Sequence, residues 1–377
     1  MYLIFYILSS FPALAFNFGL GNVPVRYLAL PMLAFFSKTK KVDFLLLCCS
    51  LVHFVYCVGA AGVRPFAVID FSYILGFIYI LLGVAVVRKN PRGFRVFVIC
   101  FWCFNIVYAL YQDLVLMLGG SQDWVLMHEN THDLSYSIPA VELFPFLYRV
   151  TGLFVESAPF VIYLMITHLA FSVLGVSKWL RWINLVLIFF AGAKVGYVFL
   201  LLLVASYIMS RLRFRLLKFM MAGVLMLLVF APVLLNLIVE ANSFGSLWVR
   251  LSSFYELFFG FSSSVFGLLF GYGFVSSAQL ISGDFEGPMR GIDFFSTYIY
   301  ANGILGSLLL LTPLVLWIFR NTRDLTLVQK NLSSLIIFLA LLTMGSLLNF
   351  QYAYYLFVIA FSAESHERMR IRFEDVD

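Results

Sequence analysis

The sequence predicts an all-α polytopic membrane protein, because of its composition and the places where its charges lie. Of its 377 residues, 63% are hydrophobic and only 12% are charged, whereas apolar residues make up roughly 45–50% of an average soluble domain. The mean hydropathy is +0.98. Nineteen of the 25 Lys and Arg residues gather in six short clusters between or after long apolar stretches, as is typical of cytoplasmic helix ends. We therefore expect one membrane domain over residues 1–377, with both termini in the cytoplasm.

The basic clusters also give the expected order of the helices, because an even number of crossings must separate two cytoplasmic clusters. A spanning helix needs about 20 largely apolar residues, and fewer if it is short or re-entrant. Residues 1–20 lack the basic start of a signal peptide and are interpreted as a retained first helix. With a short hairpin, the total is about twelve transmembrane helices. The other expected single helices are residues 24–37, 43–62, 67–87, 96–118, 157–176, 219–240, 297–319, 332–347 and 349–363.

The apolar stretch 182–209 allows two interpretations, because it is long enough for one crossing while both its flanks are basic. In the first, two short helices meet at residues 191–194, and Lys194 lies at the apex of a half-depth hairpin. Such an apex must line protein or a wet cavity. In the second, the stretch is one long helix, and the Lys194 side chain extends to the membrane surface.

Two long segments are expected on the outer side, at about residues 119–156 and 241–296. Loops of this length usually carry function or are disordered, and the aromatic content of these two argues against disorder. They also contain most of the expected external carboxylates. Cations and carboxylates that face one outer cavity would suit an anionic lipid-linked substrate and a hydroxyl group to be activated.

Six basic residues lie outside the clusters, where a cation is either a lipid anchor or part of a site. They are Arg26, Arg64, Arg149, Lys194, Arg250 and Arg290. Arg26 and Arg64 are interpreted as anchors at the membrane surface. The net charge of +6 is explained by the clusters, so no nucleic-acid partner is expected. The five cysteines lie in apolar stretches and are predicted to be small core residues, without disulfides or zinc.

Four segments carry a resemblance to a known family. They are Arg149-Val-Thr-Gly-Leu-Phe-Val-Glu156, the run FFAGAK that ends at Lys194, Trp248-Val-Arg250 with the later Gly-Tyr-Gly of residues 271–273, and Asp293 to Gly306. In this order they resemble the O-antigen polymerase (Wzy) family, of the O-antigen ligase and polymerase superfamily. One position departs from the family pattern, since Lys194 stands where the family has Arg. This exchanges a bidentate phosphate ligand for a point charge.

The resemblance implies a glycosyltransferase C-like membrane fold and a lipopolysaccharide or related polysaccharide polymerase. Such enzymes join undecaprenyl-pyrophosphate-linked oligosaccharides at the periplasmic face of the bacterial inner membrane. Membrane lipids and a chain-length regulator protein are the further expected partners, and no cofactor or metal is expected. The implied pyrophosphate ligands are Arg149, Lys194, Arg250 and Arg290. The candidate catalytic residues are Glu156 and Asp293, one of which would be the base, and Glu156 could instead orient Arg149.

Each of these residues also has a structural interpretation. Arg149 could lie at the membrane surface, with Glu156 stabilising a helix start. Arg250 could anchor an amphipathic helix at the lipid headgroups. Arg290 and Asp293 could flank a helix entrance without touching substrate.

Three other functions compete with the polymerase. Residues 128–132 fit the H-E-x-x-H pattern of zinc proteases, but Asn and Thr inside the motif disfavour a helix there. The ligase of the same superfamily has a His in its large outer loop, and residues 241–296 contain none. A flippase or other transporter of lipid-linked oligosaccharides predicts internal repeats and ionisable residues deep in many helices, and neither is found in the sequence.

Overall fold

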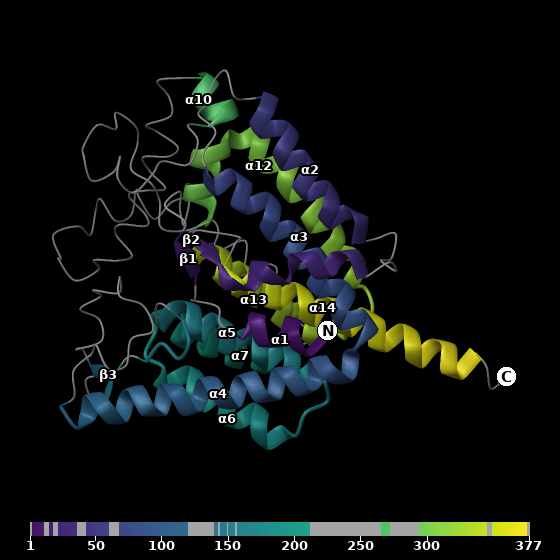
Figure 1. Ribbon diagram of the computed structural model, residues 1–377. Helices are drawn as coiled ribbons and strands as arrows, with labels where there is room; N and C mark the ends of the chain where they lie inside the picture. Colours follow the sequence, from purple (N-terminus) through teal and green to yellow (C-terminus); the bar gives the residue numbers. More distant parts are fainter. Residues whose placement is uncertain are drawn as a thin grey trace.

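The computed structural model shows a mainly helical protein with two short antiparallel strand pairs (Figure 1). The all-α prediction is therefore confirmed in its main feature. The description below covers residues 2–10, 15–17, 22–35, 43–59, 68–119, 139–141, 144–148, 150–154, 157–211, 265–271, 294–344 and 349–374.

The N-terminal region differs from the expected pair of helices. Helix α1 (Tyr2–Ser9) ends after eight residues, and strands β1 (Ala15–Asn17) and β2 (Asn22–Pro24) follow it as an antiparallel pair. The next element, η1 (Val25–Phe35), is a 3-10 helix with Pro31 inside it. The helix predicted at residues 1–20 is present only over 2–9, and the helix predicted at 24–37 is present over 25–35 as a 3-10 helix. A proline inside a helix removes an N–H donor from the hydrogen-bond ladder, and Pro31 does so in η1.

The next three helices lie where the sequence predicts them. They are α2 (Phe44–Gly59), α3 (Val68–Lys89) and α4 (Pro91–Met117). The side chain of Asn90 accepts a hydrogen bond from Gly93 N and caps the start of α4, which leaves the chain almost no loop between α3 and α4. Between α4 and the next helix, strands β3 (Pro139–Val141) and β4 (Phe144–Tyr148) pair in the first expected outer loop.

The stretch 182–209 contains a break between two helices. Helix α5 (Ser157–Val173) leads to α6 (Lys178–Phe190), and three residues separate the end of α6 from the start of α7 (Lys194–Arg211). The rings of Phe189 and Tyr197 lie 5.5 Å apart across the break, whereas eight residues of continuous helix would separate their Cα atoms by about 12 Å. The interpretation as one long helix was wrong.

The described residues after 264 form three long helices and one short helix. Helix α10 (Val265–Phe270) lies in the second expected outer loop, next to α12 (Phe294–Asn321). Helix α12 is kinked at Gly303, whose φ of 66° and ψ of 179° are not helical. Helices α13 (Leu327–Thr343) and α14 (Phe350–Glu374) complete the core.

Two of the described helices are long and apolar enough to cross a membrane, namely Pro91–Met117 and Tyr298–Asn321. The expected number of about twelve spans is not confirmed. Four other described helices are apolar but shorter, and the expected helix at 219–240 lies outside the described residues. Three cysteines, Cys48, Cys100 and Cys103, are exposed. The prediction of core cysteines was therefore wrong for these three, and holds for Cys49 and Cys57.

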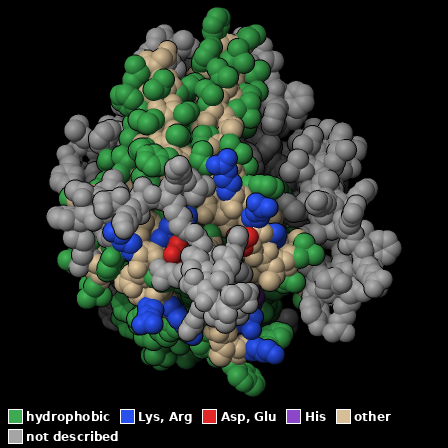
Figure 2. All heavy atoms as spheres, turned by 90° about the vertical axis from the view of Figure 1, so that its right-hand side faces the viewer, with side chains coloured by type: hydrophobic (Ala, Val, Ile, Leu, Met, Phe, Trp, Pro, Cys, Tyr) green, Lys and Arg blue, Asp and Glu red, His purple; other side chains and the backbone are tan. Residues whose placement is uncertain are grey.

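The basic clusters of the described chain come together on one face. Figure 2 shows Lys and Arg side chains gathered on that face below a largely apolar region. Buried contacts tie the helix ends there, since Arg88 Nη2 lies 2.9 Å from Asp43 Oδ1 and 2.8 Å from Asn321 Oδ1. Trp317 Nε1 donates to the same Asp43 oxygen at 3.1 Å. This face, called the basic face below, includes the ends of α3 and α12 and the starts of α4, α6 and α13.

Candidate functional site

The turn at residues 150–154 is held by a glutamine of α4. Gln112 Oε1 accepts hydrogen bonds from Thr151 N at 3.0 Å and from Gly152 N at 2.9 Å. Its Nε2 donates to Thr151 Oγ1 at 2.9 Å and to Gly152 O at 3.3 Å. Both Gln112 and Thr151 are buried, and buried backbone groups need such partners. One neutral side chain therefore satisfies the backbone of a turn that lies inside the protein.

Asn105, two helical turns before Gln112, holds the other side of this turn. Its Oδ1 accepts from Leu153 N at 3.1 Å, and its Nδ2 donates to Phe101 O at 2.9 Å. Gly152 has a φ of +55°, and a Cβ there would lie 2.8 Å from the ring of Phe160 and 3.0 Å from Asn105 Oδ1. Only glycine fits both the backbone conformation and the space. Arg149 and Glu156 flank this clamped turn in the sequence.

The break between α6 and α7 is built from small residues. Gly192 has a φ of +74°, a conformation that favours glycine. Gly196, in the first turn of α7, lies against α6 and α5. A Cβ on it would be 3.0 Å from Ile188 O and 3.0 Å from Val161 Cγ1. The glycines thus allow the chain to turn and α7 to pack closely beside α6, with Lys194 as the first residue of α7.

A small cavity of about 60 Å³ lies where the clamped turn meets the helix break. Val150 lines it from the turn, and Ala191 lines it from the break. The structure therefore brings the chain beside Arg149 and the chain beside Lys194 to one place. The full lining is Ile106, Ala109, Leu110, Asp113, Val150, Phe160, Leu187, Phe190 and Ala191.

Asp113 is the charged residue among those that line this cavity, and the sequence analysis did not single it out. It follows Gln112 in α4 and is half-buried. A carboxylate inside a long apolar helix is itself a signal of function, and that signal would have identified Asp113 from the sequence. The clamp residues Asn105 and Gln112 carry a weaker signal, because amides inside apolar helices often serve packing alone.

Two further segments that carry the family resemblance, one at Gly271 and one at Gly303, contact each other through these glycines. Gly271 ends α10 with a φ of +76°, and a Cβ on it would lie 2.5 Å from Ala301 O and from Gly303 N. The hydroxyl of Tyr56 in α2 lies 2.6 Å from Phe270 O and 2.5 Å from Asn302 O. The glycine turn after α10 therefore packs directly into the kink of α12, and α2 supports both.

Among the six isolated cations, Arg26 is the one whose side chain lies within the described residues. Its position contradicts the prediction that it anchors the protein at the membrane surface. Its exposed fraction is 5%, so it does not anchor the surface of the protein. Its guanidinium lies 5.5 Å from the ring centroid of Tyr27 and 6.0 Å from that of Tyr79. Tyr79 lies ten residues before Lys89 in α3, which is about 15 Å of helix from the basic face. Arg26 therefore lies deep in the helical core, stabilised by aromatic faces.

The other predicted site residues are only partly placed. Lys194 has a described backbone at the start of α7, and its side chain is not described. Arg64, the H-E-x-x-H segment 128–132 and the remaining predicted ligands and bases lie outside the described residues. Those ligands and bases are Arg149, Glu156, Arg250, Arg290 and Asp293.

Comparisons with protein families, with curated proteins and with solved structures found no match to this chain. The function is therefore argued from the residues and their geometry.

Proposed function

We propose that this chain is a multi-pass glycosyltransferase of the bacterial inner membrane, which polymerises undecaprenyl-pyrophosphate-linked oligosaccharide repeats into O-antigen or a related polysaccharide at the periplasmic face. The observation that carries the proposal is the cavity shared by the clamped turn and the α6–α7 break. Arg149 precedes the turn and Lys194 begins α7. Two distant segments of the sequence would thus each bring a cation to one place.

The position of the cavity supports a site on the outer side. Seventeen residues of α4 separate Arg92, on the basic face, from Ala109, which lines the cavity. That length of helix corresponds to about 26 Å, close to the thickness of a bilayer's hydrocarbon core, about 30 Å. If the basic face is cytoplasmic under the positive-inside rule, the cavity lies near the periplasmic boundary.

The proposed reaction breaks the bond between the anomeric carbon of the donor glycan and the oxygen of its pyrophosphate. The acceptor hydroxyl oxygen of the next lipid-linked repeat forms the new bond to that carbon, and its proton passes to a carboxylate. The bonding electron pair leaves with undecaprenyl pyrophosphate, whose developing charge is stabilised by the cations. The proposed pyrophosphate ligands are Arg149, Lys194, Arg250 and Arg290. The proposed bases are Glu156 and Asp293, and Asp113 is added because it lines the cavity.

Single alanine substitutions of Arg149, Lys194 and Arg250 in a polymer-producing strain test this function through the surface glycan. The proposal predicts loss of long chains while lipid core capped with one repeat remains, because ligation of single repeats does not need the polymerase. Loss of all surface glycan would instead point to a ligase or a flippase. An unchanged distribution of glycan chain lengths, called the ladder below, in all three variants at normal protein levels would contradict the proposal.

A further inference from the structure

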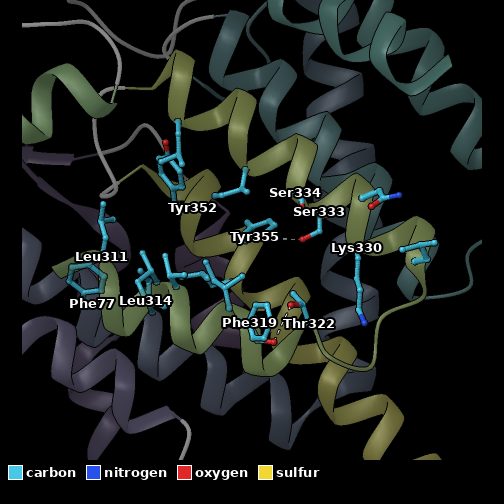
Figure 3. A pocket seen from close by; sticks show the side chains of 18 residues that line it. Phe77, Leu311, Leu314, Phe319, Thr322, Lys330, Ser333, Ser334, Tyr352 and Tyr355 are labelled. Carbon is cyan, nitrogen blue, oxygen red and sulfur yellow. Dashed lines mark hydrogen bonds between the residues drawn. The ribbon is translucent and has the colours of Figure 1, made fainter. Parts of the chain in front are cut away.

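An apolar groove of about 580 Å³ opens between α12 and α13, away from the cavity described above. Its floor is formed by α3 and α14 (Figure 3). Exposed apolar side chains border it, since Val315 is 57% exposed and Phe319 is 77% exposed. The groove is therefore accessible from the side of the helical core, where a membrane would place lipid.

The length of the groove matches one leaflet of a bilayer. Along α12 it extends from Thr322, the residue after the helix end, to Leu311, and on α13 from Lys330 to Leu341. Eleven residues separate the ends on each helix, which corresponds to about 16 Å. Half of the hydrocarbon core measures about 15 Å. The groove thus extends from the basic face to the middle of the core, the distance that one acyl chain covers.

The two ends of the groove differ in polarity. Figure 3 shows Lys330 and Thr322 toward one end, and Phe77 and Leu311 toward the other. Lys330 Nζ donates to Arg323 O at 2.6 Å, which leaves further N–H donors of the ammonium group for a second acceptor. In between, the Ser333 and Tyr355 hydroxyls bond to each other at 2.7 Å, so the middle of the groove presents mainly apolar surface.

We propose that this groove binds an anionic phospholipid from the leaflet on the basic side. One acyl chain would lie between α12 and α13, and the lipid phosphate would contact Lys330 and Thr322. The basic face around the groove attracts an anionic headgroup. A polyprenyl chain is much longer than the groove, which ends near the middle of the core. The proposal rests on the membrane embedding proposed above and does not depend on glycosyl transfer.

Native mass spectrometry of the full-length protein tests this proposal. The protein is released from micelles that contain equal amounts of phosphatidylglycerol and phosphatidylcholine with the same acyl chains. Wild-type protein should retain phosphatidylglycerol roughly fivefold more than phosphatidylcholine, the factor that corresponds to about 1 kcal/mol for one basic residue at a membrane surface. Lys330→Gln should remove this preference and keep some lipid bound. Ser334→Trp should remove bound lipid, because Ser334 lines the groove and is exposed enough to accept a larger side chain.

Two matched variants serve as controls. Leu316→Trp adds the same ring to an exposed position of α12 that does not line the groove, and Lys178→Gln removes a charge elsewhere on the basic face. Both should retain lipid as the wild type does. Equal retention of the two lipids by wild type, or equal binding by Ser334→Trp and Leu316→Trp, would overturn the proposal. So would displacement of phosphatidylglycerol by equimolar undecaprenyl phosphate. None of these readouts measures polymer, so failure here leaves the glycan-ladder test of the proposed function unaffected.

Discussion

The two ends of the helical core hold their chain segments by different chemistry. At the basic face, α2, α3 and α12 are joined through charged groups, with Arg88 bonded to both Asp43 and Asn321. At the opposite end, the neutral amides of Gln112 and Asn105 hold a turn whose conformation only glycine fits. A neutral clamp satisfies the backbone without using a charge. The backbone of this turn therefore needs no charged partner, so the cations and carboxylates of the proposed site would stay available for substrate.

The largest effect on stability is expected at the basic face. Asp43→Asn removes the nearer of two carboxylates beside buried Arg88, since Glu364 Oε2 lies 3.9 Å from Arg88 Nη1. Loss of one partner from a buried ion pair costs about 3–5 kcal/mol, and because Glu364 remains we expect the lower end of that range. The unfolding midpoint of the purified protein in detergent measures this loss. Asp324→Asn, at an exposed position of the same face, should leave the midpoint unchanged. If both variants unfold like the wild type, the charged network does not hold this end together.

At the opposite end, Gly152→Ala should cost about 2–3 kcal/mol. The added methyl group meets Phe160, and the backbone strain of a positive φ adds to that contact. Gly175→Ala separates the two causes, because Gly175 has a φ of +64° and open space around it. It should cost only about 1 kcal/mol. Equal costs for the two variants, measured by unfolding in detergent, would show that the packing around the turn is not tight.

The clamp itself is tested by Gln112→Leu. This change leaves the N–H groups of Thr151 and Gly152 without their acceptor, at an expected cost of about 1–3 kcal/mol. Under the proposed function the polymer ladder should also shorten at normal protein levels, because Arg149 directly precedes the turn in the sequence. Leu114→Ala, at an exposed position on the same helix, is the control. A destabilised variant with a normal ladder would show that the clamp serves stability and is not needed for polymerisation.

The smallest effect is expected at the start of α13. Thr326 and Gln329 form a capping box there, and Thr326→Ala should cost about 1 kcal/mol. The ladder should keep its length, since this cap lies on the basic face. A shortened ladder at normal protein levels would contradict the proposal that only the end opposite the basic face takes part in polymerisation.

The sequence predicted the long helices well and the short elements poorly. Apolar length and flanking charge located α3 and α4, because both signals are properties of a local segment. The same signals failed before residue 36, where Pro31 lies within a 3-10 helix and the apolar composition stayed high. Hydropathy does not record how many N–H donors a segment can offer.

For the candidate site, the sequence identified two segments but not their supports. The runs around Arg149 and Lys194 stood out as charges in apolar surroundings. The structure brings Val150, next to Arg149, and Ala191, three residues before Lys194, to one cavity. The clamp by Gln112 could not be predicted, because it joins positions 39 and 40 residues apart. Arg26 was assigned to the surface because a single sequence does not show that tyrosines would enclose it.

The most direct measurement compares the two ends of α6 with the same substitution. Lys178 begins α6 on the basic face, and Lys194 follows the break after α6. At equal protein levels, Lys194→Ala should lose long glycan chains and keep the single capped repeat, whereas Lys178→Ala should give the wild-type ladder. Lys194→Arg should keep polymer, since the charge remains. If Lys194→Ala and Lys178→Ala give the same ladder, the helix break does not hold a catalytic cation and the proposed site is wrong.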